Sequence, residues 1–500
     1  MAPAPAPVSG TSAAFLRSGP TKLLIGGEWV EAADGSTFET INPATGEVLM
    51  TCASGQAADV DRAVRAARRA LEGPWSRVSP AERGSMLWRL ADLIEHHADL
   101  LAEIETLDNG KPLAHSRNDD IALVVDQLRY YAGWTTKIEG QTIPVSSDPN
   151  HFNFTLREPV GVVGAIVPWN YPLQMAVWKL APALACGNTC ILKPAEQTPL
   201  TAVWLGRLAL EAGIPPGVVS VITGYGETAG AALSSHPDVD LLVFTGSTEV
   251  GRAIVTASAG NLKRVALELG GKSPNIICAD ADLDKAIAGA ANAVFYNMGQ
   301  DCSAGTRVFV ADEVHDEVLA GLAREADSRT IGDGLTPGVD QGPLVSEEQL
   351  DKVLAYLAAG EQEGAQLVTG GARVVGDGLG RGFFVRPTVF GGVANDKKIA
   401  REEIFGPVVV VLPFSKVEDA VRMGNATRYG LGAGVWTRDV RTAHRAAREL
   451  KAGSVWVNCY NVADPASPFG GYKESGYGRD LGRDSIDVYT QVKSVWIDFG

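Results

Sequence analysis

The 500-residue sequence is long enough for about three domains and for several hydrophobic cores. Its hydrophobic fraction of 45% and charged fraction of 21% are typical of a folded globular protein, so disorder of the bulk is excluded. The 44 basic and 59 acidic residues leave a net charge of -15, which disfavours nucleic acid and anionic membranes as partners.

The chain begins with MAPAPAPVSG, which lacks both a basic segment and an apolar core. We therefore expect residues 1–20 to form a flexible tail and not a signal peptide. The 6 cysteines contain no C-x-x-C pair and the 7 histidines no H-E-x-x-H, so no metal site is predicted. So few cysteines in a long chain indicate a reducing compartment, and we expect a cytoplasmic protein. No apolar run approaches the ~20 residues of a membrane helix.

Helical periodicity begins at residues 60–71. A second helix opens at Ser79-Pro80-Ala81-Glu82, a capping box with proline in the first turn, and its pattern can continue to the stop at Asn109-Gly110.

From residue 161 short apolar runs alternate with helical patterns. This alternation predicts a parallel sheet covered on both faces, of the Rossmann-like kind that binds ligands beyond the carboxyl ends of its strands. The expected strands are 162–167, 189–192, 218–222, 241–244 and 264–267, and the expected helices are 173–184, 198–212, 227–233 and 248–258.

A second α/β unit is predicted after a boundary near Gly270-Gly271. Its expected strands are 274–278, 307–310, 408–412, 433–436 and 454–457, and its expected helices are 283–296, 314–323, 347–359, 417–423 and 442–450.

Two extended segments fit neither unit, namely residues 140–156 and the alternating strand 488–497. An unpaired strand edge is a liability for aggregation. The segments can pair within the chain or add strands across subunits, and we favour the second arrangement.

Four local signals carry chemistry. The turn at Gly246-Ser247 joins a strand to a helix start that can accept phosphate, although Ala266 in place of glycine excludes a P-loop at residues 266–273. Cys302 lies in a glycine-flanked loop, where it can be either a nucleophile or a small buried hydrophobic residue. Glu268 ends an apolar strand, where its carboxylate can either belong to a site or be paired with another group. Asn170 follows a strand, where asparagine commonly forms a turn.

These signals occur in motifs that together resemble the aldehyde dehydrogenase superfamily. The resemblance runs from about Leu24 to the C-terminus, and it is carried by Pro168-Trp169-Asn170, Lys193-Pro194-Ala195-Glu196, and the segments 244–248, 267–272, 299–307, 402–407 and 468–476.

The resemblance implies an α/β fold of three parts. A Rossmann-like NAD-binding domain would comprise residues 21–139 and 159–269, and an α/β catalytic domain residues 270–485. Residues 140–158 and 486–500 would form a small β oligomerisation module, so we expect a homo-oligomer, either a dimer or a tetramer.

The resemblance also implies the chemistry. Cys302 would attack an aldehyde carbonyl to give a thiohemiacetal, whose oxyanion the Asn170 side chain and the Cys302 backbone amide would stabilise. Hydride transfer would leave a thioester, and Glu268 would activate the water that hydrolyses it. We assign no step to Lys272.

The expected cofactor is NAD, because a carboxylate at Glu196 would repel the 2′-phosphate of NADP. Lys193 and Glu196 would bind the adenosine ribose. The other expected cofactor contacts are Gly246 and Ser247 at the pyrophosphate, Glu403 and Phe405 at the nicotinamide ribose and ring, and Pro168 and Trp169 in the same slot.

Five residues would line the aldehyde tunnel, namely Leu123, Trp178, Tyr296, Asp301 and Phe469. Three of them are aromatic, which favours medium-sized aliphatic or aromatic, phenylacetaldehyde-like substrates. Asp301 raises the alternative of an aminoaldehyde or betaine aldehyde. Its charge would also raise the pKa of the Cys302 thiol, whereas the alternative is that Asp301 simply caps a turn or points away. A non-catalytic binding protein on the same fold is a more remote alternative.

Overall fold

The computed structural model describes residues 8–500, and helix α1 (Gly10–Leu16) lies near their start. Ser9 caps this helix, and Phe15 is buried in a small cluster with Leu100 and Ile104. The prediction of a flexible tail is therefore wrong for residues 10–16, because an aromatic anchor fixes the helix to the body. The first seven residues of that prediction lie outside the described residues.

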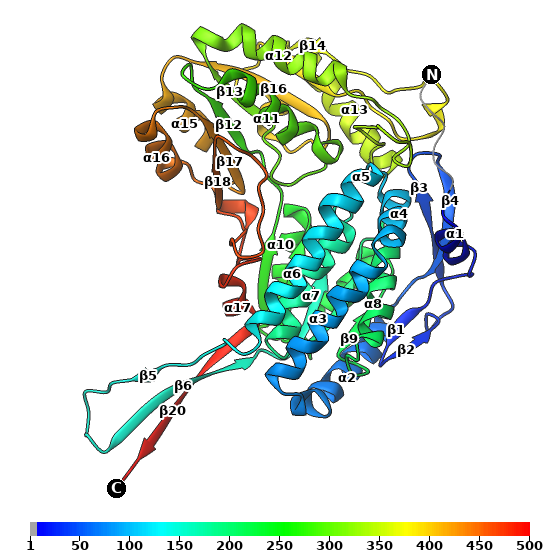
Figure 1. Ribbon diagram of the computed structural model, residues 1–500, viewed down its shortest axis with the longest axis vertical. Helices are drawn as coiled ribbons and strands as arrows, with labels where there is room; N and C mark the ends of the chain where they lie inside the picture. The colour runs from blue at the N-terminus through cyan, green and yellow to red at the C-terminus, as the bar shows by residue number, and fades with distance from the viewer. Residues whose placement is uncertain (1–7) are drawn as a thin grey trace.

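The first sheet has eight strands in the order β19-β11-β10-β7-β8-β9-β1-β2 (Figure 1). Its five central strands are parallel, which confirms the Rossmann-like prediction. They are β7 (Val162–Ile166), β8 (Thr189–Lys193), β9 (Val219–Val221), β10 (Leu241–Thr245) and β11 (Arg264–Glu268). The antiparallel edge strands are β1 (Leu23–Ile25), β2 (Glu28–Val30) and β19 (Gly476–Tyr477).

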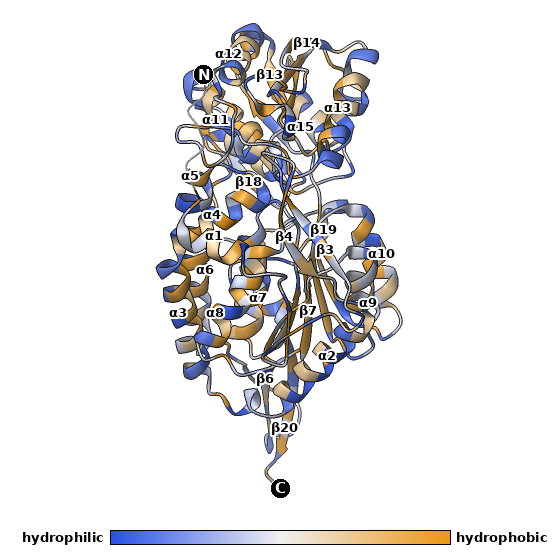
Figure 2. Ribbon diagram, turned by 90° about the vertical axis from the view of Figure 1, so that its right-hand side faces the viewer, coloured by the Kyte–Doolittle hydropathy of each residue, from blue (hydrophilic) through white to orange (hydrophobic). Residues whose placement is uncertain are grey.

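Helices cover both faces of this sheet, as the continuous apolar strands require (Figure 2). One face carries α3 (Pro80–His96), α6 (Ile121–Trp134), α7 (Pro172–Ala185) and α8 (Leu200–Glu211); the other carries α2 (Ala57–Glu72), α9 (Ala231–Ser235) and α10 (Thr248–Ser258).

The pattern that predicts one helix from residue 80 to residue 109 corresponds to two helices in the structure. It breaks at His97, whose φ of -97° and ψ of 17° depart from helical geometry, and α4 (Ala98–Asn109) continues beyond it. The break turns α4 toward α8 and the hairpin of β3 (Thr37–Asn42) and β4 (Glu47–Ala53).

The second sheet has seven strands in the order β14-β15-β16-β13-β12-β17-β18. The predicted strands are present as β12 (Pro274–Ile277), β13 (Arg307–Ala311), β16 (Val408–Phe414), β17 (Gly432–Trp436) and β18 (Ser454–Val457). The structure adds β14 (Gln366–Thr369) and β15 (Thr388–Gly391). The associated helices are α11 (Leu283–Phe295), α12 (His315–Ser328), α13 (Glu347–Gln362), α15 (Val417–Asn425) and α16 (Val440–Glu449).

The two sheets meet end to end. Strand β11 ends at Glu268 and β12 begins at Pro274, so the carboxyl edge of the first sheet faces the amino edge of the second. The predicted boundary near residue 270 is found at this junction. Strand β19 is an exception, because it lies within the segment 270–485 assigned to the second unit and yet pairs with β11 of the first sheet.

The two extended segments form an arm that projects from the body (Figure 1). Its three strands are β5 (Thr142–Ile143), β6 (His151–Pro159) and β20 (Thr490–Asp498), and β20 pairs with β6 along nine residues. The alternative of pairing within the chain is thus correct for these strands. The strand prediction began too early, because residues 488–489 belong to helix α17 (Asp484–Tyr489).

No helix of residues 8–500 is long and apolar enough to cross a membrane.

Candidate active site

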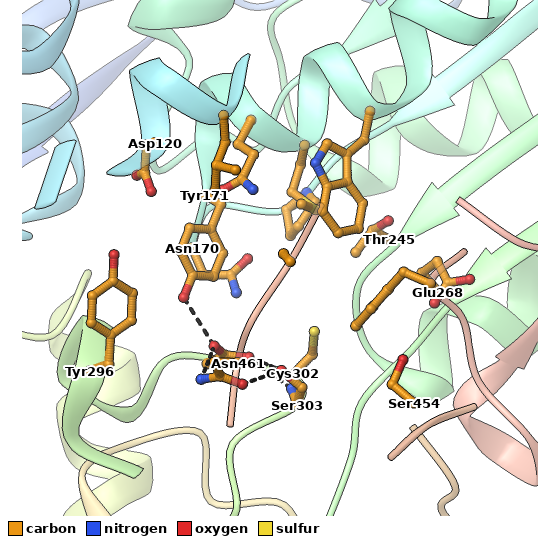
Figure 3. A pocket seen from close by; sticks show the side chains of 18 of the residues that line it. Asp120, Asn170, Tyr171, Thr245, Glu268, Tyr296, Cys302, Ser303, Ser454 and Asn461 are labelled. Carbon is orange, nitrogen blue, oxygen red and sulfur yellow. Dashed lines mark hydrogen bonds between the residues drawn. The ribbon is translucent and has the colours of Figure 1, made fainter. Parts of the chain in front are cut away.

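A cavity of about 1240 Å³ lies between the two sheets (Figure 3). It is next to the switch point of the first sheet, where β8 and β10 lie on opposite sides of β7. Most of the predicted site residues line it: Leu123, Pro168, Trp169, Asn170, Trp178, Gly246, Ser247, Glu268, Tyr296, Asp301, Cys302, Glu403, Phe405 and Phe469. Lys193 and Glu196 do not line it. They form an ion pair with each other, with 2.9 Å between Nζ and Oε2.

The three residues predicted to be catalytic come from three different elements. Asn170 follows β7 and Glu268 ends β11, both at the carboxyl edge of the first sheet. Cys302 lies in the loop before β13, at the amino edge of the second sheet. In Figure 3 its sulfur lies between the labelled Asn170 and Glu268 side chains.

Two glycines permit the close approach of the loop that contains Cys302. A Cβ on Gly299 would lie 2.2 Å from the backbone of Gly406, and the residue has a φ of +69° that favours glycine. A Cβ on Gly271 would lie 2.3 Å from the carbonyl oxygen of Cys302. The glycines therefore hold the loop of Cys302 against the end of the first sheet.

The electrostatic surroundings of Cys302 oppose ionisation. Burial is the largest cause that raises the pKa of its thiol well above the ordinary value, and the carboxylates of Asp301, Glu403 and Glu268 add to it. The predicted effect of Asp301 on this pKa has the expected direction, although it is second to burial. The thiol consequently needs a base before it can act as a nucleophile.

Asn170 is buried, and its amide is oriented by the loop that contains Cys302. Its Nδ2 donates a hydrogen bond of 2.9 Å to the carbonyl oxygen of Gln300. An amide nitrogen carries two N–H groups, so the second one is left for a group bound beside Cys302. This geometry suits an oxyanion donor.

Glu268 is a buried carboxylate with an incomplete set of partners. Its Oε2 has no hydrogen-bond partner among residues 8–500. Burial is the largest cause that raises its pKa well above the ordinary value; the nearby carboxylate of Asp480 raises it further, while Lys179 and Arg479 lower it. A raised pKa makes the carboxylate a stronger base for water or for a thiol.

The residues predicted to grip a nicotinamide, Glu403 and Phe405, line the cavity together with Trp169. The rings of Trp169 and Phe405 meet edge to face with centroids 5.1 Å apart. The Oε1 of Glu403 accepts a hydrogen bond of 2.9 Å from the backbone N–H of Gly271. Ser247 caps α10 by accepting a 3.2 Å bond from the N–H of Val250.

Three of the residues predicted to line the aldehyde tunnel are aromatic, and all three line the cavity. Trp178 and Phe469 meet edge to face at 5.4 Å. The hydroxyl of Tyr296 donates a 2.9 Å bond to Asp119, and the ring stacks on His115 with centroids 4.7 Å apart. Asp119 belongs to a π-helical turn, η2 (Ser116–Asp120). The contact between Tyr296 and Asp119 thus links the two α/β units beside the cavity.

Asp301 both caps a turn and faces the cavity. Its Oδ1 accepts two 2.8 Å bonds from the backbone N–H and the hydroxyl of Ser303. Its Oδ2 accepts bonds of 3.1 Å from Tyr171 and 3.2 Å from Asn461. The predicted alternative of a capping role therefore describes one of its two oxygens.

Sequence reasoning missed several residues of the site: Asp119, Tyr171, Asn461 and Asn297. Tyr171 directly follows the motif that contains Asn170, and Asn297 lies two residues before Gly299, so both could have been found by extending the motifs. The other two reach the site from distant segments. Residues 8–500 contain no cluster of three or more His, Cys, Asp or Glu side chains that could hold a metal ion.

Comparison with known proteins identifies the family of the chain. The model of the aldehyde dehydrogenase family matches residues 29–495. The chain is 51% identical to a human protein named aldehyde dehydrogenase, mitochondrial, over 479 residues that cover 95% of this chain and 92% of the human one. The chain belongs to the aldehyde dehydrogenase family, and it is an oxidoreductase that acts on aldehydes.

Two solved structures are similar over nearly the whole chain. One is an NAD⁺ complex of an aldehyde dehydrogenase from Bacillus cereus, with 50% identity and a TM-score of 0.97; the match covers 99% of this chain and 100% of that one. The other is a mutant of the P. syringae indole-3-acetaldehyde dehydrogenase AldA in complex with NAD⁺ and IAA, with 45% identity and a TM-score of 0.94, covering 97% and 99%.

Proposed function

We propose that this chain oxidises an aldehyde to its carboxylic acid with NAD, with Cys302 as nucleophile, Glu268 as base and Asn170 as oxyanion donor. The observation that carries the proposal is the convergence of these three side chains on one cavity from three separate elements. A non-catalytic protein has no need of this arrangement.

The first half of the reaction is addition to the carbonyl. The Cys302 thiol reacts as its thiolate, so its proton must first pass to a base such as solvent water, because its raised pKa otherwise keeps it protonated. The sulfur bonds to the carbonyl carbon, and the oxyanion receives hydrogen bonds from Asn170 and the Cys302 backbone amide. A single donor of this kind contributes about 3–4 kcal/mol to stabilisation of the transition state.

The cavity residues fit a dinucleotide on chemical grounds. The start of α10 at Ser247 offers helix amides to a pyrophosphate, and the Glu403 carboxylate and the Phe405 ring line the end nearest Gly270. Bound NAD supplies an acceptor for the hydride of the thiohemiacetal.

The preference for NAD over NADP rests on Glu196. Its side chain is 26% exposed beside Lys193, so its carboxylate is available to accept hydrogen bonds from ribose hydroxyls. The same charge would repel a 2′-phosphate. The similar B. cereus protein was solved with NAD⁺, which agrees with this choice.

The second half of the reaction is hydrolysis of the thioester. Glu268 accepts a proton from a water molecule, which attacks the acyl carbon while Cys302 leaves as thiolate. The unpartnered Oε2 of Glu268 supports this role, because it keeps one acceptor free for the water.

The favoured substrates are medium-sized aliphatic or aromatic aldehydes of the phenylacetaldehyde kind. The edge-to-face pair of Trp178 and Phe469, together with Leu123, offers an apolar wall for an aryl or alkyl group. A similar protein is named as an indole-3-acetaldehyde dehydrogenase. Indole-3-acetaldehyde also has an aryl group on a short chain.

A second candidate is an aminoaldehyde or betaine aldehyde. The carboxylates that line the cavity include Asp119, Asp126, Asp301 and Asp464, and none of these four forms an ion pair within the described part of the chain. Their uncompensated charge favours an aldehyde that carries an ammonium group at its far end.

A panel of kcat/KM values with NAD separates the candidates. Hexanal and phenylacetaldehyde are compared with 4-aminobutanal and betaine aldehyde, and Cys302→Ala serves as the inactive control. We expect higher values for the two neutral aldehydes. Higher values for the two cations would establish the second candidate, and no turnover of any aldehyde by the wild type would leave the non-catalytic alternative.

We also propose that the arm mediates homo-oligomerisation, as a dimer or tetramer. The last strand exposes large apolar side chains, with Val492 at 60% and Trp496 at 58%, and Phe499 follows it at 68%. Strand β20 lies at the edge of its sheet, so its outer backbone groups have no strand partner within residues 8–500. Burial against another subunit would cover the exposed apolar side chains and pair the free strand edge.

A further inference from the structure

We propose that Asn297 is a positioning residue that sets the orientation of the Asn170 amide in the proposed oxyanion site. The proposal rests on the function proposed above and assigns a role to a residue outside the Cys302, Glu268 and Asn170 set.

Three hydrogen bonds form a closed ring between the two α/β units. The Nδ2 of Asn297 donates to the backbone oxygen of Asn170 at 3.0 Å and to the backbone oxygen of Gln300 at 3.1 Å. The side chain of Asn170 donates to the same Gln300 oxygen at 2.9 Å. All three residues are buried, with at most 4% of their surface exposed. The oxyanion donor and the loop of the nucleophile are therefore fixed to each other through Asn297.

The backbone that follows Asn297 is strained, and the strain lies chiefly at Met298. Asn297 has a φ of 49° and a ψ of 37°, Met298 a φ of 59°, and Gly299 a φ of 69°, so three successive residues are left-handed. Only glycine, and to a lesser degree asparagine, adopts this conformation at low cost. Strain of this kind persists where surrounding contacts hold it and is concentrated at active sites.

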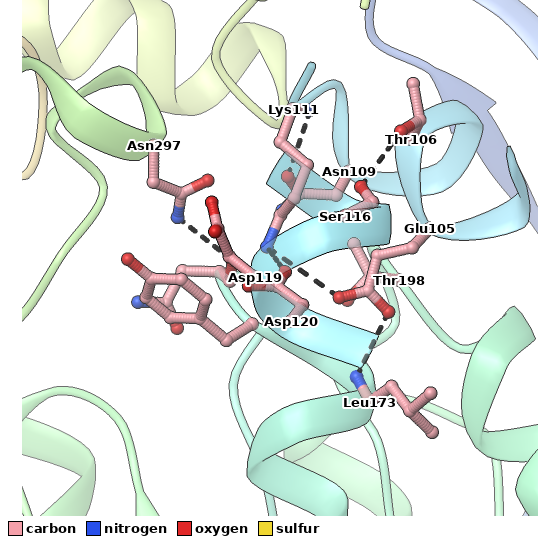
Figure 4. A network of polar contacts seen from close by, with 12 residues as sticks. Glu105, Thr106, Asn109, Lys111, Ser116, Asp119, Asp120, Leu173, Thr198 and Asn297 are labelled. Atoms are coloured by element: carbon pink, nitrogen blue, oxygen red, sulfur yellow. Dashed lines mark hydrogen bonds and ion pairs between the residues drawn. The ribbon is translucent and has the colours of Figure 1, made fainter. Parts of the chain in front are cut away.

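The loop of Asn170 is held independently on its other side (Figure 4). The Nδ2 of Asn109 donates to the backbone oxygen of Trp169 at 2.8 Å, and the carboxylate of Glu105 accepts from the N–H of Leu173 at 3.2 Å. Figure 4 shows Asn297 on the green segment of the second unit, opposite the cyan segment that carries these residues. The first unit thus fixes the position of the loop, and Asn297 couples it to the nucleophile.

This coupling decides which end of the Asn170 amide faces the substrate. The Gln300 oxygen accepts only from the nitrogen, so the bond directs one N–H of Asn170 to Gln300 and leaves the second for an oxyanion. Asn297 holds the Gln300 oxygen in place for this bond. Without Asn297 the Gln300 carbonyl can turn away, the amide can rotate, and its oxygen would then repel the developing charge.

A double-mutant cycle tests the proposal. Wild type, Asn297→Gly, Asn170→Ala and the double variant are compared by kcat/KM with hexanal and NAD. Glycine suits the left-handed backbone, so this change removes the hydrogen bonds without adding strain. We expect Asn170→Ala to lose about 10²–10³-fold and Asn297→Gly about 10–10²-fold. The double variant should be no worse than Asn170→Ala, because Asn297 acts through that residue. The proposal would be overturned if the loss of kcat/KM in the double variant equalled the product of the two single losses.

Two further measurements separate positioning from general damage. The rate at which iodoacetamide alkylates Cys302 should be unchanged in Asn297→Gly, and a slowed rate would mean that Asn297 acts on the thiol instead. Asn188→Gly is the matched control. The Nδ2 of buried Asn188 also donates to two backbone oxygens, those of Ala183 and Tyr489, but far from the cavity lining. It should lower thermal stability and leave kcat/KM near that of wild type; an equal loss of kcat/KM would refute a specific role for Asn297.

If Asn297→Gly does not fold, the same cycle is run with Asn297→Asp, which keeps the shape of the side chain and tolerates the left-handed backbone. Turnover by the wild type tests the proposed function before the cycle begins. An inactive wild type refutes that function, whereas an active wild type with multiplying losses refutes only the role of Asn297.

Discussion

Replacing Glu268 by glutamine should separate the two halves of the reaction. The change is isosteric, so it creates no cavity at this buried position, and it removes only the basic carboxylate. In the proposed reaction, hydride transfer depends on the Cys302 thiolate and on Asn170, whereas hydrolysis of the thioester depends on a base for water. The Glu268 carboxylate is also one of the charges that raise the pKa of the thiol, so its loss makes the thiol easier to ionise.

The expected loss lies in the steady state. Removing a general base costs about 10²–10⁴-fold in rate, which at 1.36 kcal/mol per tenfold is about 3–5 kcal/mol of barrier. Stopped-flow measurement of NADH with excess hexanal should therefore show a rapid burst that is stoichiometric with active sites, followed by slow turnover. Equal loss of the burst and of the steady state would refute this reasoning, because Glu268 would then act chiefly on the thiol before hydride transfer.

Three other predictions concern charge, cofactor and assembly. Asp301→Asn removes a negative charge that raises the pKa of Cys302, so the rise of kcat/KM with pH should move to lower pH; no movement, or movement to higher pH, would contradict the electrostatic argument. Glu196→Ser should raise kcat/KM with NADP relative to NAD, and a wild type that already prefers NADP would show that the carboxylate was misread. Deletion of residues 490–500 removes β20 from the arm and should reduce the oligomer seen by light scattering; a wild type that runs as a 52.6 kDa monomer at micromolar concentration would rule out the assembly.

Local sequence patterns were sufficient to predict most of the strands and helices of the two α/β units. The helix 248–258 has the bounds expected from its pattern, and strand β7 differs from expectation by one residue. Continuous apolar runs of this kind have one stable environment, the interior of a covered parallel sheet. Strand β15 was not predicted, although its four residues are all buried, because so short a run carries little periodicity.

The position of Cys302, the proposed nucleophile, could not be derived from strand order alone. Ligands of open α/β sheets bind at carboxyl strand ends, and this rule places Asn170 and Glu268 correctly. Cys302 lies instead at the amino edge of the second sheet, and the motif resemblance was needed to associate it with the other two. Contacts such as Tyr296 with Asp119 join residues 177 positions apart, which no local pattern encodes.

The return of the chain at β19 has a consequence for synthesis on the ribosome. Glu268 is paired in register with Gly476, and a Cβ at Gly470 would lie 2.7 Å from its carboxylate. Until those late residues have been translated, the outer edge of β11 is unpaired and the wall beside the carboxylate is missing. Domains near the N-terminus fold while synthesis continues, so the first sheet can form early with this edge open. The surroundings of Glu268, the proposed base, are therefore completed late, and a message truncated before Gly476 should yield a chain that exposes a strand edge and turns over no aldehyde.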